Sequence, residues 1–356
     1  MNVFIILKSA DKDASFFIQQ WADIEEIDNI YVFRNKAAFP ISKTTYIQLP
    51  TSKFKKLSHV FRFFQLLRKR KLHPDVIVGI YEIPHGLLAV LTSMCLKKPA
   101  IVSITGNPAY AKIRKGLRMK LTLWVLKKAK FITVTGSNSK IFLTTKGIPS
   151  DKIYVLPNTM DFSNYNPNID EVKTYDIVSL GRLSFEKRLD RLINIVYELK
   201  KEFSWIKVAI GGRGPEKPHL QKLIADLELE KNIDLLGFIP EEEISLFFQR
   251  GKVFVLTSET EGFPRTILQA AACRIPVVSS MVGDINDIVE HNINGFCIKE
   301  TDNIMEYVYY IRELLTNTEL NQLFGQRLNA KVREQFNHSQ ATKVWKGIIY
   351  KMISHE

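Results

Sequence analysis

The chain has 356 residues, of which 46% are hydrophobic and 24% charged, and its formal net charge is +13. This length suits two domains better than one core, and the composition is that of an ordinary soluble globular protein. No apolar run approaches the ~20 residues that cross a bilayer, and residues 1–8 lack the features of a signal peptide, so we expect a cytoplasmic protein without a membrane span.

Cysteine and histidine usage narrows the chemistry. The three cysteines lie far apart in apolar surroundings, which favours buried free thiols in a reducing compartment over a disulfide framework. The seven histidines show no metal-ligand spacing, so we expect no structural metal.

The charge is distributed unevenly along the chain. Residues 1–160 contain 26 Lys and Arg against 9 Asp and Glu, whereas residues 161–356 contain 24 against 28. This asymmetry predicts an anionic partner for the N-terminal half.

The N-terminal half alternates short apolar runs with helical patterns, which predicts a βαβ architecture. The predicted strands are Val3–Leu7, Asn29–Phe33, Thr45–Leu49, Val76–Ile80, Ala100–Ile104, Phe131–Thr135 and Ile153–Leu156.

Two segments of this half, 53–72 and 112–130, are basic and helical in pattern. The second has eight basic and no acidic residues. The apolar positions of the first, near helical spacing, are Leu57, Phe61, Phe64 and Leu67. Such helices are typical of proteins on anionic lipid surfaces, whereas the alternative is two ordinary helices with their apolar faces on the sheet. Together the two segments favour an anionic membrane surface; nucleic acid is not expected, because no nucleic-acid-binding motif is present.

Two loops follow strands of this half and carry candidate site residues. The segment Tyr81-Glu82-Ile83-Pro84-His85-Gly86 follows Val76–Ile80, and Thr105-Gly106-Asn107-Pro108 follows Ala100–Ile104. Open α/β sheets bind ligands at the carboxyl ends of their strands. His85 is the nearest titratable candidate for chemistry, and a structural hydrogen bond is its alternative role.

The second half opens after a polar, turn-rich stretch, 163–173, which predicts a linker. The strand Tyr175–Leu180 leads into a loop in which Gly181 permits close backbone approach. Arg182 and Lys187 place two cations there that can hold phosphate. In the alternative interpretation, Arg182 pairs with Glu186 and Lys187 is solvated.

Two further strands lead into glycine-containing loops. Ile206–Ile210 precedes Gly211-Gly212-Arg213-Gly214-Pro215, whose glycines let the backbone approach a nucleotide, although a plain turn explains Arg213 equally well. Ile233–Leu236 precedes Gly237-Phe238-Ile239-Pro240.

The segment from Val253 to Val289 predicts the central binding element. A strand, Val253–Thr257, runs into a loop, and a helix begins near Pro264, whose fixed φ and missing N–H suit the first helical position. A second strand and a helix near Asp284 follow. A helix N-terminus at a strand end suits phosphate or sugar hydroxyls.

Two polar side chains of this segment are candidates for binding. Glu261, directly before the helix, can accept hydrogen bonds from a polyol, and Gln269 lies roughly two turns further on near the same face. A capping carboxylate is the alternative role of Glu261. The remaining predicted helices are Ile304–Leu315, Glu319–Glu334 and His338–Ile353.

The phrase Glu261-Gly262-Phe263-Pro264, the stretch 271–278 and the loop 181–187 together resemble the signature of retaining glycosyltransferases of family 4. The resemblance covers essentially the whole chain and is specific from Gly181 to Val289. This chain departs from the family pattern at Gln269, which replaces a second glutamate, at Arg274, which replaces a glycine, and at Thr105, where many members have a histidine.

The resemblance implies an α/β protein of the GT-B fold, with two Rossmann-like domains facing across a cleft. The N-terminal acceptor domain would span 1–162, and the nucleotide-sugar donor domain 174–337. The C-terminal helix, 338–356, would cross back to the N-terminal domain.

The resemblance also implies a reaction and its residues. A sugar would pass, with retention, from a UDP- or GDP-sugar to a lipid-linked or polysaccharide acceptor, in cell-surface glycan biosynthesis at the inner face of the membrane. The implied catalytic residues are Glu261, Arg182, Lys187 and His85. The implied donor-binding residues are Gly181, Arg182, Lys187, Gly212, Arg213, Gly214, Phe238, Ile239, Glu261, Gly262, Phe263, Pro264, Arg265 and Gln269. The implied acceptor-binding residues are His85, Thr105, Gly106 and Asn107. We expect no metal and no cofactor, because two cations and a helix dipole can offset the charge of a leaving diphosphate.

Other functions remain compatible with parts of the sequence. A basic membrane- or nucleic-acid-binding protein with a degenerate transferase site fits the three departures, and a nucleotide-sugar epimerase shares the fold class. A glycoside hydrolase is disfavoured, because no second carboxylate pairs persuasively with Glu261. Nucleotide binding discriminates between the enzyme and the binding protein.

Overall fold

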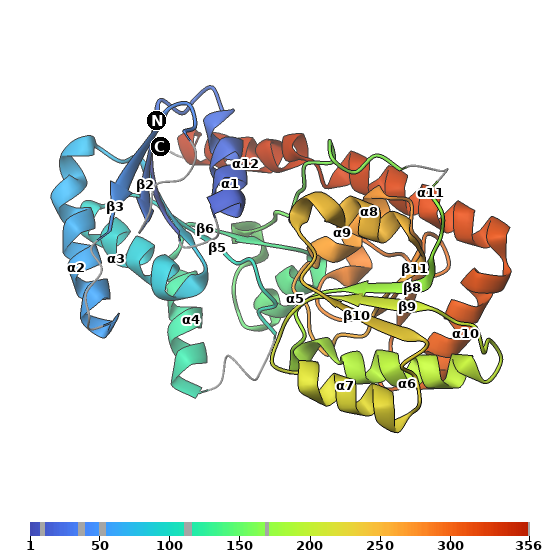
Figure 1. The fold of residues 1–356 in the computed structure, drawn as a ribbon. Helices are drawn as coiled ribbons and strands as arrows, with labels where there is room; N and C mark the ends of the chain where they lie inside the picture. Colours follow the sequence, from blue (N-terminus) through green and yellow to red (C-terminus); the bar gives the residue numbers. More distant parts are fainter. Residues whose placement is uncertain (8–10, 35–39, 50–54, 110–115, 168–170, 355–356) are drawn as a thin grey trace. The chain divides into compact units, whose positions relative to one another are not determined.

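The computed structural model describes residues 1–7, 11–34, 40–49, 55–109, 116–167 and 171–354 (Figure 1). Contacts within the chain divide it into two compact units. The first unit comprises Met1–Asn158 and His338–Glu356, and the second comprises Thr159–Asn337.

The first unit is built on a parallel sheet of seven strands in the order β3-β2-β1-β4-β5-β6-β7. Its strands are β1 (Asn2–Ile6), β2 (Asn29–Arg34), β3 (Thr44–Gln48), β4 (Val76–Ile80), β5 (Ala100–Ser103), β6 (Phe131–Val134) and β7 (Ile153–Val155). Its helices are α1 (Asp11–Ala22), α2 (Lys55–Arg68), α3 (Leu87–Leu96), α4 (Gly116–Lys128), α5 (Ser137–Thr145) and α12 (His338–Ile353).

Strand β1 shows why the strands of this sheet are continuous runs of apolar residues. Val3 and Ile5 point into the cluster that contains α1 and α12, whereas Phe4 and Ile6 point into the cluster that contains α2 and α3. Because helices cover both faces of the sheet, both sets of alternating side chains must be apolar.

The final helix, α12, belongs to the first unit and packs on α1 (Figure 1). The rings of Trp345 and Trp21 lie 4.4 Å apart, and the Trp345 indole N–H donates a hydrogen bond to Gln20. His338 Nε2 lies 2.5 Å from the Asp23 carboxylate. The return of the C-terminal helix, predicted from the resemblance, is therefore confirmed.

The second unit is built on a parallel sheet of six strands in the order β10-β9-β8-β11-β12-β13. Its strands are β8 (Tyr175–Leu180), β9 (Val208–Gly211), β10 (Ile233–Gly237), β11 (Gly251–Leu256), β12 (Val277–Ser280) and β13 (Phe296–Ile298). Its helices are α6 (Leu189–Lys200), α7 (Lys217–Asp226), α8 (Ile244–Gln249), α9 (Arg265–Ala272), α10 (Ile304–Thr316) and α11 (Thr318–Gln335). In Figure 1, α8 and α9 lie over one face of this sheet, and α6 and α7 lie over the other.

Both sheets follow the strand order of dinucleotide-binding folds. In each sheet the second and third strands lie on one side of the first strand, and all later strands lie on its other side. The strand order therefore reverses between β1 and β4 in the first unit and between β8 and β11 in the second. Ligands of such sheets bind at the carboxyl ends of the strands that flank this reversal.

The structure corrects four details predicted from the sequence. Pro264 is the residue before α9, with an extended ψ of 116°, because an N-cap residue lies outside the helical region, and α9 begins at Arg265. The helix predicted near Asp284 is a single turn, Ile285–Asp287, after which the chain bends. The predicted linker 163–173 contains Tyr165, which is buried in the core of the second unit because its ring is largely apolar. Cys95 is exposed, whereas the other two cysteines are buried.

Burial of the thiols affects their chemistry. Removal from water raises the pKa of Cys273 to about 11 and that of Cys297 to about 11, so both are neutral at physiological pH.

Within the described part of the chain, no helix has the length and apolar character needed to cross a bilayer.

The apolar side chains of α2 fall on two faces. Phe61 and Phe64 are both 56% exposed, so they are not part of a face packed on the sheet, which is the alternative interpretation of this segment, whereas Arg62 is only 8% exposed. Leu66, one turn beyond Arg62, is buried in the cluster that contains α3. The face of α2 toward α3 is therefore set by Leu66 and the half-buried Phe63, whereas Phe61 and Phe64 face outward.

Candidate active site

The loops that follow β8 and β11 meet at the reversal of the second sheet. The backbone N–H of Glu259 donates to the Glu186 carbonyl at 2.8 Å, and the Thr257 hydroxyl donates to the Arg188 carbonyl at 2.8 Å. These bonds hold together two loops that are far apart in the sequence, at the edge where ligands of this fold bind.

Lys187 and Glu261 form an ion pair across these two loops. Lys187 Nζ lies 2.5 Å from Glu261 Oε1, and the Ser258 hydroxyl donates to the same oxygen at 2.6 Å. Among the described residues, none donates a hydrogen bond to Glu261 Oε2. The carboxylate is thus oriented by one oxygen and can accept a ligand hydroxyl with the other.

Arg182 supplies a second cation on the β8 loop. Its guanidinium is exposed and forms neither a hydrogen bond nor an ion pair with any residue in the described ranges. The alternative pairing with Glu186 is not formed, and that carboxylate instead accepts a hydrogen bond from the Ser184 hydroxyl at 2.7 Å. Partial burial acts to raise the pKa of Glu186, but hydrogen bonds from Ser184 and its own backbone, with the charges of Lys187 and Arg182, lower it overall. Arg182 therefore remains available to an anionic ligand.

Two glycines allow loops from the adjacent strands to pack closely on the loops that carry Arg182 and Glu261. Gly212, with φ +144°, packs so closely on Gly181 that a Cβ would lie 1.8 Å from the Gly181 carbonyl oxygen. Gly283, with φ +60°, packs in the same way on the carbonyl of Glu261, where a Cβ would lie 2.1 Å away. Both the cation-bearing loop and the glutamate loop are thus braced backbone to backbone by a loop from the adjacent strand.

We expect Gly212→Ala to lower the free energy of unfolding by about 1–3 kcal/mol, because the new Cβ forces the backbone apart at a conformation that alanine disfavours. Denaturant unfolding of the whole chain measures this change. Gly347→Ala is the control: Gly347 is exposed in α12 with nothing within 4 Å of its Cβ position, and its replacement should stabilise by about 0.5–1 kcal/mol. Equal unfolding curves for the wild type and Gly212→Ala would contradict the close approach.

The loops after β9 and β10 form one edge of the site. Arg213 stacks its guanidinium over the exposed ring of Phe238, 4.9 Å from the ring centre, while Gly214 follows it on the same loop. The Gly212 N–H donates to the Gly237 carbonyl, which joins the two loops. Ile239 is half-buried and packs against Gly211.

The rest of the β11 loop is held by the core. The Gly262 carbonyl accepts a hydrogen bond from the Asp284 N–H at 3.0 Å. The Phe263 ring is buried and lies 5.2 Å from that of Phe336, so this residue can offer a ligand only its backbone. Arg265 is half-buried at the first position of α9.

Gln269 is buried and bound inside the second unit. Its side-chain amide donates to the Tyr165 hydroxyl at 2.9 Å, and burial raises the pKa of that tyrosine. A neutral amide is easier to bury than the glutamate of the family pattern, which gives a physical reason for this departure. Its predicted contact with a ribose stays a prediction.

The acceptor candidates lie in the first unit. His85 is buried in the short helical turn Glu82–Gly86 after β4, with its Nδ1 2.9 Å from the Ile80 carbonyl. Because a carbonyl only accepts, Nδ1 carries the proton in this bond and fixes the orientation of the ring. After β5, Thr105 and Gly106 are half-buried, and the Asn107 side chain accepts a hydrogen bond from the Ala109 N–H at 2.8 Å.

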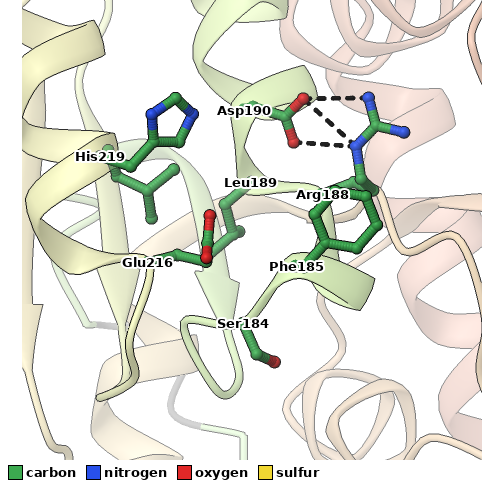
Figure 2. A pocket seen from close by; sticks show the side chains of 8 residues that line it. Ser184, Phe185, Arg188, Leu189, Asp190, Glu216 and His219 are labelled. Atoms are coloured by element: carbon green, nitrogen blue, oxygen red, sulfur yellow. Dashed lines mark hydrogen bonds and ion pairs between the residues drawn. The ribbon is translucent and has the colours of Figure 1, made fainter.

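A pocket of about 200 Å³ lies beside the β8 loop at the start of α6 (Figure 2). Arg188 points along its wall, but the guanidinium is bound to the Asp190 carboxylate at 3.0 Å. None of the three residues Arg182, Lys187 and Glu261 lines this pocket. The pocket is therefore distinct from the cluster that these three residues form at the reversal of the second sheet. The described residues contain no group of three or more His, Cys, Asp or Glu side chains that could hold a metal ion.

Sequence reasoning missed Ser258. This serine is fully buried at the end of β11, and its hydroxyl orients Glu261. Its position three residues before Glu261, directly after an apolar strand, is the only signal in the sequence, and serine is too common in loops for that signal to be specific.

Comparison with known proteins supports the resemblance seen in the sequence. Residues 164–330 match the family model described as Glycosyl transferases group 1. The chain is 25% identical to an uncharacterized glycosyltransferase of Haemophilus influenzae, over 98% of this chain and 94% of that protein. It is 30% identical to one of the subunits of the human phosphatidylinositol N-acetylglucosaminyltransferase over 43% of this chain, and it spans only 32% of the length of that relative.

Among solved structures, Anabaena HepE in complex with UDP matches with a TM-score of 0.80 at 15% identity, over 98% of this chain and 99% of that chain. This likeness confirms the predicted fold class: two Rossmann-like parallel sheets of the GT-B type.

Proposed function

We propose, from the premise that residues 164–330 are a Glycosyl transferases group 1 domain, that this protein transfers a sugar from a nucleoside diphosphate sugar to a lipid-linked or polysaccharide acceptor. The donor would occupy the second unit, at the carboxyl ends of β8 and β11. The reaction would retain the configuration of the anomeric carbon and need no metal.

The observation that carries this proposal is the cluster of Arg182, Lys187 and Glu261 at the sheet reversal. Lys187 and Glu261 are joined by a contact of 2.5 Å, and Arg182 has no partner among the described residues. A diphosphate needs cationic donors that are already in place, and a sugar needs an oriented acceptor for its hydroxyls. The cluster offers both within one set of loops.

The chemistry follows from where charge develops. As the bond between the anomeric carbon and the phosphate oxygen breaks, negative charge grows on the leaving diphosphate, next to Arg182 and Lys187. The N-terminus of α9 adds the positive end of a helix dipole after Glu261. The acceptor oxygen bonds to the same face of the sugar, and its proton passes to the leaving phosphate oxygen. No separate general base is then required.

Related proteins suggest the donor and the acceptor. Anabaena HepE was solved with UDP and with UDP-glucose, which favours a UDP-sugar over a GDP-sugar. The human relative belongs to a phosphatidylinositol N-acetylglucosaminyltransferase, and another relative is a glycosyltransferase of amylovoran biosynthesis in Erwinia amylovora, so lipid-linked and polysaccharide acceptors both have precedents.

The test is nucleotide binding. We expect UDP at millimolar concentration to raise the melting temperature of the protein, because a ligand present at about 100 times its Kd adds roughly 2.7 kcal/mol to the stability of the unit that binds it. GDP is the comparison ligand. If neither nucleotide changes the melting temperature, the transferase proposal fails and the binding-protein alternative gains.

Screening nucleotide sugars then identifies the donor. A transferase releases UDP or GDP slowly from its own donor even when only water accepts the sugar. An epimerase of the same fold class would instead return an altered nucleotide sugar with the sugar still attached.

A further inference from the structure

An open apolar pocket of about 610 Å³ lies among the helices of the first unit. Its apolar walls are Ile83 and Pro84 from the turn after β4, Leu87 and Leu88 from α3, and Leu117 and Leu121 from α4. The helix α3 contacts both α2 and α4, which border the pocket (Figure 1). Its volume lies within the roughly 300–1,000 Å³ of small-molecule sites, and its lining is mostly apolar, as in such sites.

The two bordering helices expose large apolar side chains to solvent. Leu117 is 82% exposed, and Leu121 and Trp124 on the same helix are also exposed. On α2, Phe61 and Phe64 face outward. Exposed apolar side chains on the helices that border a pocket indicate a site of interaction with a protein, a membrane or a ligand.

The charge of this surface is entirely positive on the two helices. Neither the described part of 55–72 nor α4 contains an acidic residue. Two basic side chains, His59 and Arg118, line the pocket itself. The basic residues that follow along the same helices are Arg68, Lys69, Arg70, Lys71, Lys120, Lys127 and Lys128. Of the predicted basic segments, residues 53–54 and 112–115 lie outside the described residues.

We propose that this pocket binds a hydrocarbon chain of an anionic membrane lipid, with the phosphate of the lipid held by Arg118 and His59. An apolar pocket bordered by a guanidinium and an imidazole, which can both donate hydrogen bonds to phosphate, matches a molecule with an apolar chain and an anionic head. A nucleic acid matches the cations but not the pocket, because phosphates and sugars would leave the leucine walls uncovered.

The position of the pocket connects it to the acceptor candidates. The turn Glu82–Gly86 that contributes Ile83 and Pro84 to the wall also carries His85. A lipid anchored in the pocket would therefore have its head next to the loop predicted to bind the acceptor. This inference rests on the proposed function and deepens it, because it names a phosphate-bearing lipid as the acceptor class.

Alkyl phosphates of different chain length test the pocket without any transfer reaction. Dodecyl phosphate, below the concentration at which it forms micelles, is compared with butyl phosphate and inorganic phosphate. We expect affinity to rise about three- to fourfold for each methylene that enters the pocket. Equal binding of all three would overturn the proposal and leave a phosphate site only.

A matched pair of variants locates the effect. Leu121→Glu places a carboxylate on the pocket wall, and Ile141→Glu makes the same change of charge at an exposed position of α5 in the same unit. We expect Leu121→Glu to weaken dodecyl phosphate binding at least tenfold and Ile141→Glu to leave it unchanged. Equal affinities in the two variants would reject the pocket as the site.

Two further measurements, sedimentation with lipid vesicles and binding of UDP, are made on the wild type and both variants. The wild type should sediment with vesicles of phosphatidylglycerol and phosphatidylcholine at low salt, and Leu121→Glu should sediment less than Ile141→Glu. Binding of duplex DNA with no loss in Leu121→Glu, in the absence of vesicle binding, would favour the nucleic-acid alternative and overturn the proposal. UDP binding is measured in each variant, so a failure of the lipid pocket is separated from a failure of the donor site.

Discussion

Replacing Glu261 by glutamine is expected to lower kcat by at least ~100-fold while UDP still binds. The amide cannot match the carboxylate as an acceptor for donor-sugar hydroxyls, and it offers Lys187 no negative partner. Because Lys187 then loses its ion pair, its ammonium becomes more available to the diphosphate. The affinity for UDP should therefore stay the same or increase, which a purely structural role of Glu261 would not produce.

Glu259→Gln is the matched control for this change. Glu259 lies in the same loop, and the contact of its carboxylate with Arg188 is long, at 3.9 Å. We expect its kcat to remain within about twofold of the wild type, because a partly exposed pair of this length contributes little. Steady-state kinetics with the identified donor and calorimetric titration of UDP measure both variants. Unchanged kcat in Glu261→Gln would remove this residue from the catalytic centre.

Replacing Arg182 by alanine is expected to lower kcat/KM by at least ~100-fold and to weaken the binding of UDP. Its guanidinium is exposed on the β8 loop without a partner among the described residues, so its removal breaks no internal contact there. The loss should therefore appear in ligand binding and rate, while the melting temperature without ligand changes little.

Two further variants test the assignment of Arg182. Arg182→Lys keeps the charge but loses the bidentate geometry, so it should recover part of the rate. Arg312→Ala removes an arginine from α10, whose exposed pair with Glu202 at 3.7 Å is weak, and it should leave kinetics and UDP binding unchanged. If Arg182→Ala binds UDP as tightly as Arg312→Ala does, the guanidinium does not contact the diphosphate.

The ion pair between Lys187 and Glu261 has a consequence for the order of events. In the protein without ligand, the lysine charge is neutralised by the carboxylate at 2.5 Å. A diphosphate must compete for that ammonium, and a sugar hydroxyl must approach the same carboxylate. The complete donor can bind both groups at once, its diphosphate to Lys187 and its sugar hydroxyl to Glu261. UDP alone can bind only Lys187. We therefore infer that the glutamate favours the intact donor over the product UDP.

The amino-acid sequence by itself determined the class of fold and most of the site's composition. Strands such as β1 and β4 are covered on both faces, so each must be a continuous apolar run, and such runs are visible without any structure. Arg182, Lys187 and Glu261 could likewise be named, because they lie in loops that follow apolar strands and in phrases that resemble the family signature.

Only the tertiary structure decided which of these residues meet. Lys187 and Glu261 are 74 positions apart and touch because β8 and β11 are neighbours at the reversal of the sheet. Gln269 meets Tyr165 across 104 positions, in a stretch that reads as a linker. The outward faces of Phe61 and Phe64 depend on the rotation of α2 against α3, which helical periodicity does not specify when apolar and basic residues alternate closely. Strand order, helix rotation and contacts between distant loops arise from packing among elements, and a local pattern of residues does not contain that information.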